Sequence, residues 1–263
     1  MFPLRIIYNI EKQNFFDLVN FESMRNDMNK KVMIFDLYDT VLMNDNFMFE
    51  NGLKYLYETY FSNKCTFDEF IKYAESFLPL YEKRKTDHVE ICLINDELPL
   101  IFKKYGIDLP KDIDELEYNV MNKMQKVFLT ADVKETLEEL WKEDIKMYIL
   151  SNSIFTGKAA EKLLEEFDIL QYFEGIFSSA DYKIRKPNKK FFEIALNCIN
   201  SNLNDMVYVG NDYNTDVKGA TAIGLSAIWL NIKHHENKED VECIEVDNFK
   251  EILKYIVKRQ IQK

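Results

Sequence analysis

The 263-residue chain is poor in the residues that mark several classes of protein. Its four cysteines are far apart and form no Cys-x-x-Cys pair, which argues against structural zinc and against a disulfide framework. No stretch approaches the roughly 20 apolar residues that span a bilayer. The apolar run in residues 1–7 is also too short for a signal peptide. We therefore expect a cytoplasmic protein with reduced thiols.

Positive charge is also scarce. The chain has 34 Lys and Arg against 45 Asp and Glu, a net charge of -11, and an isoelectric point near 5.0. This excess of negative charge repels polyanions, so we expect no nucleic-acid partner and no anionic membrane partner. A local basic pocket for one small anion remains open. Hydrophobic residues make up 47% of the chain, which favours a sizeable core over global disorder.

Short apolar runs are typical of parallel strands that are buried on both faces. Three such runs lie at residues 32–35, 145–150 and 206–209. A fourth follows at 225–230, and a shorter one lies at 175–177. Amphipathic helical segments separate these runs. Alternating strands and helices predict an α/β fold with a Rossmann-like, doubly wound parallel sheet.

The segment between the first two strands is much longer than the roughly 30 residues of a strand–helix–strand unit. Apolar residues recur in it at helical spacing, at 49–60 and again at 113–128. Thr66-x-x-Glu69 has the pattern of a capping box that opens another helix. The predicted division is an all-helical cap domain at 44–127 and an α/β core at 1–43 and 128–263, with an N-terminal extension at 1–30.

Polar side chains follow the predicted strands directly. Asp36 ends the first apolar run, Ser151 ends the second, and a loop beginning at Gly210 follows the third. Ligands of open α/β sheets bind beyond the carboxyl ends of the strands, so we expect these residues to converge there. A carboxylate at the mouth of a buried strand is costly unless it is hydrogen-bonded, bound to a metal or chemically active. With Lys186, the set predicts an enzyme that handles phosphoryl-like groups through a covalent aspartyl intermediate.

Four short motifs occur in a fixed order along the chain. They are Asp36-x-x-x-Thr40, Ser151-Asn152, Lys186-Pro187 and Gly210-Asn211-Asp212-x-x-x-Asp216. In order and spacing they resemble the four motifs of the haloacid dehalogenase (HAD) superfamily, and the resemblance runs from Lys31 to about Leu230. The flanks of the last two motifs are similar to subfamily I, which carries a helical C1-type cap between motifs one and two. The resemblance implies a HAD-like hydrolase.

The resemblance also implies a catalytic role for each motif residue. Asp36 would be the nucleophile, and Thr40 would close its loop and orient it. Ser151 would donate a hydrogen bond to a transferring phosphoryl oxygen, with help from Asn152. Lys186 would neutralise the nucleophile and the negative charge that develops in the transition state.

A magnesium site and a substrate class follow from the same resemblance. The implied metal ligands are Asp36, the backbone carbonyl of Tyr38, Asp212 and Asp216. An all-oxygen set of this kind suits Mg²⁺, which also keeps some of its waters. The implied partner is a small phosphorylated molecule, hydrolysed through an aspartyl-phosphate. The sequence indicates neither the physiological substrate nor the oligomeric state.

Tyr38 departs from the phosphatase pattern, which has a second Asp at this position to protonate the leaving group and activate water. A phenol with a pKa near 10 is a poor base at neutral pH. Tyr at this position resembles the 2-haloacid dehalogenases, which attack a carbon bearing halide without a metal. Those enzymes place an arginine soon after the first motif, and it has no counterpart here. The Asp212/Asp216 pair also argues for a metal.

A third possibility is a catalytically weakened binding protein, since Asn211 stands where one version of the fourth motif has its first Asp. We favour the Mg²⁺-dependent phosphatase over both alternatives. The neighbouring Asp39 is expected to point away from the site. A basic run in the helical insert either faces the site and holds an anionic substrate or forms a solvated surface, which is the commoner arrangement. This run is Lys83, Arg84 and Lys85.

Overall fold

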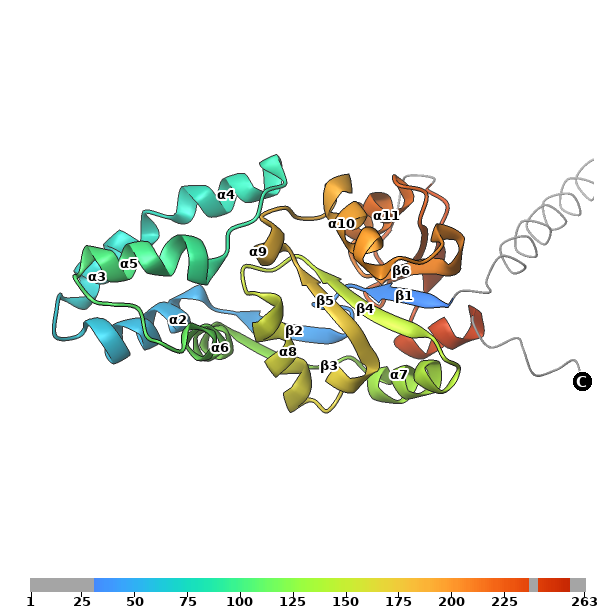
Figure 1. Cartoon of the computed structure of the whole chain (residues 1–263), viewed down its shortest axis with the longest axis horizontal. Helices are drawn as coiled ribbons and strands as arrows, with labels where there is room; N and C mark the ends of the chain where they lie inside the picture. Colours follow the sequence, from blue (N-terminus) through green and yellow to red (C-terminus); the bar gives the residue numbers. More distant parts are fainter. Residues whose placement is uncertain (1–30, 237–240, 256–263) are drawn as a thin grey trace, which may run out of the picture.

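The computed structural model describes residues 31–236 and 241–255, so the predicted N-terminal extension at 1–30 lies outside the described residues. Figure 1 shows an elongated molecule with a sheet covered by helices at one end and a group of helices at the other. A thin two-stranded ribbon runs between the two ends. Within the described ranges, no helix is long and apolar enough to cross a membrane.

The main sheet has six strands in the order β5-β4-β1-β6-β7-β8, and all neighbouring pairs are parallel. The predicted doubly wound α/β fold is therefore confirmed. Each of the five apolar runs forms a strand, whereas β8 was not predicted. The strands are β1 (Val32–Phe35), β4 (Lys146–Ser151), β5 (Phe173–Ser178), β6 (Met206–Gly210), β7 (Ser226–Leu230) and β8 (Ile244–Val246).

Strand β1 lies inside the sheet, and all four of its side chains are buried. Phe35 is in register with Ile149 of β4 on one side and with Val209 of β6 on the other. The residues that follow these three positions therefore leave the sheet at the same edge. The parallel register thus carries the first, second and fourth motifs to one place.

Helices cover both faces of this sheet. On one face, Met33 and Phe35 pack with apolar residues of α7 and α8, and the rings of Phe35 and Phe249 stack at 5.6 Å. On the other face, Val32 and Ile34 pack with α10 and α11. The helices of this part are α7 (Val133–Lys142), α8 (Gly157–Glu166), α9 (Ser179–Tyr182), α10 (Lys189–Ile199) and α11 (Lys218–Thr221), with a 3₁₀ turn at Phe249–Tyr255.

The segment between β1 and β4 contributes a group of helices with an aromatic centre. Phe61 is fully buried and contacts the rings of Phe70 and Phe102 at about 5 Å. The predicted capping box is present, with Thr66 and Glu69 bonded reciprocally at the start of α3. The helices are α2 (Phe49–Leu56), α3 (Phe67–Glu75), α4 (Leu78–Asp87), α5 (Leu98–Lys104) and α6 (Ile113–Met124), with π-helical turns at Tyr57–Phe61 and Leu93–Glu97.

One helical prediction in this segment is wrong at its end. The helical spacing predicts a helix that includes Val127 and Phe128, but α6 ends at Met124 and the chain continues as strand β3 (Gln125–Leu129). This strand pairs antiparallel with β2 (Leu42–Phe47). Burial along β3 alternates, as in a ribbon with one covered face. The predicted boundaries at 44 and 127 fall within these two strands and stay a prediction.

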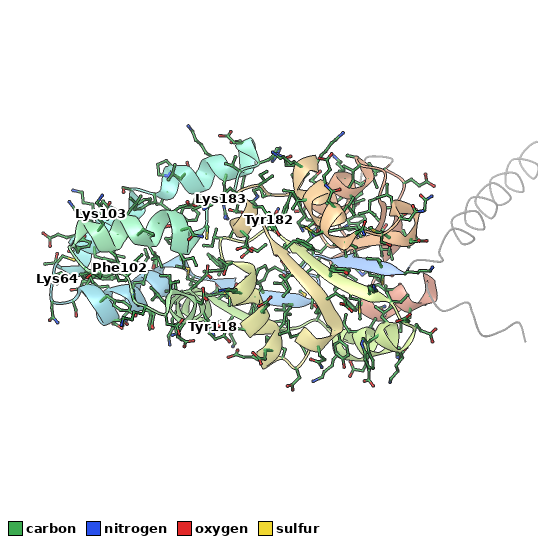
Figure 2. The ribbon with its side chains drawn as sticks, viewed as in Figure 1. Lys64, Phe102, Lys103, Tyr118, Tyr182 and Lys183 are labelled. Carbon is green, nitrogen blue, oxygen red and sulfur yellow. The ribbon has the colours of Figure 1, made fainter. Side chains whose placement is uncertain are left out.

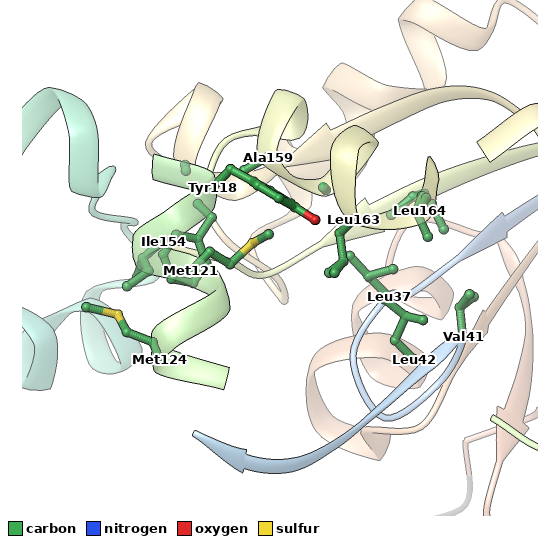
Figure 3. Close-up of a cluster of buried hydrophobic side chains, with 14 of the residues drawn as sticks. Leu37, Val41, Leu42, Tyr118, Met121, Met124, Ile154, Ala159, Leu163 and Leu164 are labelled. Atoms are coloured by element: carbon green, nitrogen blue, oxygen red, sulfur yellow. The ribbon is translucent and has the colours of Figure 1, made fainter. Parts of the chain in front are cut away.

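The helical group packs against the sheet-bearing part through α6. Figure 3 shows Tyr118 and Met121 of α6 facing Ile154 and Ala159, the latter on α8, within one continuous cluster of buried side chains. Leu37, from the loop after β1, belongs to the same cluster. The helical group and the loop that carries the first motif therefore share one apolar core.

Candidate active site

Three charged side chains that are distant in the sequence meet at the carboxyl edge of the sheet. The Lys186 ammonium donates hydrogen bonds to Asp36 Oδ1 and to Asp216 Oδ1, both at 2.7 Å. All three residues are buried, and Lys186 is only 2% exposed. When both carboxylates are ionised, this cluster carries one uncompensated negative charge.

Tyr208 on β6 completes the cluster and was missed by the sequence analysis. Its hydroxyl accepts a hydrogen bond from Lys186 Nζ at 2.6 Å and lies 3.1 Å from Asp216 Oδ1. The Tyr208 side chain is fully buried, and burial raises its pKa well above 10, so it is a neutral partner. The sequence does contain an indication of this role, namely a tyrosine within a buried apolar strand, because a buried phenol hydroxyl needs a hydrogen-bond partner.

Burial dominates the electrostatics of the predicted nucleophile. It raises the pKa of Asp36 to about 7, although Lys186 opposes the shift and Asp216 adds to it. Burial alone would lower the pKa of Lys186, but Asp216 and Asp36 outweigh that effect and raise it. The lysine therefore stays protonated beside a carboxylate that is strongly desolvated. Such shifts are typical of functional sites.

The second motif supplies one unpaired hydroxyl and one clamp. Ser151 is 2% exposed, and its Oγ has no hydrogen-bond partner among the described residues. A buried hydroxyl without a partner is costly, and an oxygen of a bound anion would satisfy it. The Asn152 side chain instead forms two hydrogen bonds with the backbone of Lys186. Its Oδ1 accepts from the Lys186 N–H at 2.8 Å, and its Nδ2 donates to the Lys186 carbonyl at 3.0 Å.

Thr40 ties the first motif to the fourth. Its side chain is fully buried, and its hydroxyl donates to Asn211 Oδ1 at 3.3 Å. The Asn211 carbonyl in turn accepts from the indole N–H of Trp229 at 2.9 Å. Asp39 adopts a left-handed conformation with φ 58°, and its Oδ1 accepts from the backbone of Asn44. The other carboxylate oxygen of Asp39 lies 4.0 Å from Lys233 Nζ, so both oxygens have partners outside the Asp36–Lys186–Asp216 cluster.

The fourth-motif acids occupy different surroundings. Asp212 is exposed, and its Oδ1 accepts from the N–H groups of Asn214 and Thr215. Asp216 is buried, and its Oδ2 accepts from the Asp212 N–H at 3.0 Å. Since Asp216 Oδ1 is bonded to Lys186, both oxygens of Asp216 already have partners. Metal binding by Asp216 would compete with these bonds, and the roles of both acids stay predictions.

A cavity of about 420 Å³ lies beside this loop. Its lining includes Asp39, Asn211, Asp212 and Lys233. The cavity therefore adjoins the first and fourth motifs, whereas Lys186 and Ser151 are not among its lining residues.

Tyr38 uses its hydroxyl outside the charged cluster. Gln125 Nε2 donates to this oxygen at 3.1 Å, and the hydroxyl lies 3.9 Å from Met121 Sδ at the end of α6. Burial raises the pKa of Tyr38 to about 12, although the hydrogen bond from Gln125 lowers it. At neutral pH this phenol is protonated, so it cannot act as the base that the usual Asp supplies.

The donors near Asp36 fit a hard divalent cation in their chemistry. Among the described residues, no group of three His, Cys, Asp or Glu side chains is arranged to hold a metal. Other oxygens lie in the same loops, namely the Tyr38 carbonyl and the amide oxygen of Asn211. Carboxylate, carbonyl and amide oxygens together with waters are the ligands that Mg²⁺ prefers. A cation would also offset the uncompensated negative charge of the cluster.

Comparison with known proteins decides the family. Residues 33–230 match the sequence profile described as haloacid dehalogenase-like hydrolase. The chain belongs to this family. It is therefore a HAD-like hydrolase, and the match contains all four motifs that suggested the resemblance.

Two curated proteins that match part of the chain are phosphatases. A ribulose-1,5-bisphosphate 5-phosphatase of Halopiger xanaduensis is 30% identical over 105 residues, which cover 40% of this chain and 43% of that protein. A glyceraldehyde 3-phosphate phosphatase of Methanothermobacter thermautotrophicus is 35% identical over 105 residues, covering 40% and 46%. The chain thus matches less than half the length of these two relatives.

The structural likeness covers more of the chain. A 2-haloacid dehalogenase from Pseudomonas syringae has a TM-score of 0.62 and 21% identity, and the match covers 86% of this chain and 97% of that one. At this identity the likeness shows the HAD-like fold alone. The chemistry of this HAD-like hydrolase therefore has to be argued from its own site.

Proposed function

We propose that this HAD-like hydrolase is a Mg²⁺-dependent phosphatase that acts on a small phosphorylated metabolite through an aspartyl-phosphate. The observation that carries the proposal is the Lys186 ammonium, which bridges Asp36 and Asp216 at 2.7 Å each inside the protein. A buried cation beside a desolvated carboxylate is suited to a nucleophile that attacks an anionic phosphate ester. The names of the two matched phosphatases support the same class.

In the first half of the reaction, a carboxylate oxygen of Asp36 attacks phosphorus. The bond from phosphorus to the ester oxygen breaks, and the leaving alkoxide takes a proton from water. Lys186 remains protonated and offsets the negative charge on the phosphoryl oxygens. The Ser151 hydroxyl, buried and without a partner, donates to one of those oxygens. Water then attacks phosphorus, which releases inorganic phosphate and restores Asp36.

The residues that would hold Mg²⁺ are Asp36, the Tyr38 carbonyl and the loop at Asn211 and Asp212. When bound, the metal would neutralise phosphoryl charge and help to orient the ester. Thr40 keeps the first and fourth motifs together through its bond to Asn211. Asp216 contributes indirectly, because it holds Lys186 in place.

A dehalogenase is the second candidate, and Tyr38 is the observation that favours it. Because the Tyr38 phenol is protonated and turned toward Gln125, no carboxylate at this position activates water against an aspartyl-phosphate. Dehalogenation would form a carbon ester on Asp36 and release halide instead. The net negative charge of the buried cluster argues for a cation and so for the phosphatase.

Release of phosphate from p-nitrophenyl phosphate with and without Mg²⁺ tests the proposal. We expect Mg²⁺-dependent release that Asp36→Asn abolishes. Asp39→Asn is the matched control, because it removes a carboxylate from the same loop and Asn tolerates the left-handed conformation of this position. The control should keep most of the activity.

Two other outcomes point elsewhere. Metal-independent halide release from 2-chloropropionate would favour the dehalogenase. Neither activity, together with no Mg²⁺ binding, would favour a binding protein. Tyr38→Asp restores the usual acid/base, so a large gain in phosphate release would show that its absence limits turnover in the native chain.

A further inference from the structure

A second buried charge cluster lies where the helical group meets the sheet-bearing part. Its centre is Glu90, which follows α4 and whose side chain has no exposed surface. Arg84 Nη1 on α4 lies 2.8 Å from Glu90 Oε1. Arg185 Nη1, from the other side of the junction, lies 3.5 Å from Glu90 Oε2. One carboxylate thus holds two guanidinium groups.

The backbone fixes this cluster next to the catalytic lysine. The Glu90 N–H donates to the Lys183 carbonyl at 3.1 Å, and the Arg185 N–H donates to the His88 carbonyl at 3.2 Å. Figure 2 labels Lys183 at this junction. Arg185 directly precedes Lys186 in the chain, and adjacent Cα atoms are about 3.8 Å apart.

Glu90 also reaches the loop of the second motif. The Ser179 hydroxyl donates to Glu90 Oε2 at 2.9 Å and accepts from the Ser153 N–H at 2.8 Å. Ser153 lies two residues after Ser151, whose hydroxyl is without a partner. The cluster is therefore connected to the loop that carries Ser151 by hydrogen bonds, and to Lys186 through the adjacent Arg185.

The cluster has more positive than negative charge. Arg84 Nε and Arg185 Nη1 are buried, and neither has a hydrogen-bond partner in the part of the chain that the structure describes. Burial lowers the pKa of Arg185; Glu90 opposes this effect, and the like charge of Arg84 adds to it. The negative charge of Asp212 also raises the pKa of Arg185, but these two residues form no ion pair within the described ranges. Buried charges are normally paired, so one anion is missing.

We infer that Arg84 and Arg185, held in place by Glu90, bind a second anionic group of the substrate. The substrate class is then a phosphate ester that also carries a carboxylate or a second phosphate. A guanidinium suits either group, because its planar donors match two oxygens at once. The side chains of Arg84 and Arg185 are only partly buried, with 21% and 13% of their surface exposed. The inference rests on the proposed phosphatase function.

Binding to the Asp36→Asn protein tests the inference without turnover. Isothermal titration calorimetry in Mg²⁺ would compare 3-phosphoglycerate with glycerol 3-phosphate, and fructose 1,6-bisphosphate with fructose 6-phosphate. The first pair tests whether the protein recognises a carboxylate, and the second tests whether it recognises a second phosphate. We expect the ligand with the extra anionic group to bind at least 10-fold more tightly in one pair.

Substitutions of the two arginines in the Asp36→Asn protein test whether these residues cause the preference for the extra anionic group. Arg84→Gln or Arg185→Gln should reduce it by about 10- to 100-fold, which corresponds to about 1.4–2.8 kcal/mol. Arg84→Lys should keep part of it. Lys85→Gln is the matched control, because it removes one positive charge from an exposed position of the same helix and should leave the preference intact.

Three outcomes would overturn the inference. They are no preference in either pair, a preference that survives both arginine changes, and an equal loss of affinity for both members of a pair. An equal loss would mean that the cluster only holds the helical group against the sheet-bearing part. Failure of the phosphatase proposal would look different: the native protein would release no phosphate from any of the four esters, while the binding comparison would still decide the role of the arginines.

Discussion

Lys186→Met removes the ammonium from the buried cluster and nearly preserves the length of the side chain. Asp36 and Asp216, each 2.7 Å from Nζ in the native protein, would then face each other without a cation. Removing one partner from a buried ion pair typically costs about 3–5 kcal/mol, because the remaining charge stays buried. We expect the free energy of unfolding to fall by about this amount at pH 7.5.

A second substitution separates charge from packing. Asp216→Asn in the Lys186→Met protein removes one of the two like charges, so the double variant should recover about 2 kcal/mol of the loss. Phosphate release should stay abolished, because the ammonium is still missing. Lys190→Met is the matched control at an exposed position of the following helix, and it should change stability by less than about 0.5 kcal/mol.

Urea denaturation followed by circular dichroism, without divalent cations, measures these differences. If Lys186→Met unfolds within about 1 kcal/mol of the native protein, the carboxylates do not depend on the ammonium, and the reasoning from burial is wrong. If the double variant is less stable than Lys186→Met, repulsion between Asp36 and Asp216 is not the cause of the loss.

Three further substitutions test the site and the contact between α6 and α8. Gly210→Ala would place a Cβ in a steric clash with the Asp216 carboxylate, so we expect a loss of about 1–3 kcal/mol in thermal unfolding, whereas Gly175→Ala, whose Cβ finds ordinary contacts, should be much milder. Asn152→Ala removes both bonds to the Lys186 backbone and should lower the kcat of phosphate release at least 10-fold, with a stability loss of about 1–3 kcal/mol; an unchanged kcat would contradict the clamp. Glu117 on α6 accepts hydrogen bonds from the backbone and side chain of Thr156 at the start of α8. Burial raises the pKa of Glu117 from 4.5 to about 7, so its ionised form is disfavoured in the fold and stability falls as pH rises through this range. Glu117→Gln should therefore be up to about 3 kcal/mol more stable than the native protein at pH 8, at about 1.36 kcal/mol for each pH unit, and the two should converge below pH 4.5; a constant difference across pH would refute this.

The sheet and its site could be predicted because their signals are local. Apolar runs such as 32–35 and 206–209 match β1 and β6 closely, since strands buried on both faces need continuous apolar sequence. The convergence of Asp36 and Ser151 follows from a parallel sheet, whose strands end at one edge. Lys186 lies in a loop, so its place in the site could be predicted only from the family motif.

Other features could not be read because they depend on distant partners. The periodicity that forms α6 continues past Met124, yet the chain becomes a strand because β2 pairs with it there. Nothing near Tyr208 or Glu90 in the sequence identifies Lys186 or Arg84 as the partner. The hydrogen bonds of both Asp216 oxygens likewise depend on the tertiary structure and cannot be predicted from the sequence.

The ribbon of β2 and β3 has a consequence for how such proteins diversify. Phe47 and Gln125 are partners across the ladder, so the two ends of the helical segment are about one strand spacing apart. Two residues in a tight hairpin turn would close that gap. A change in the length of 48–124 therefore need not alter the register of the six-stranded sheet, whereas a replacement for α6 would have to match the apolar surface of α8.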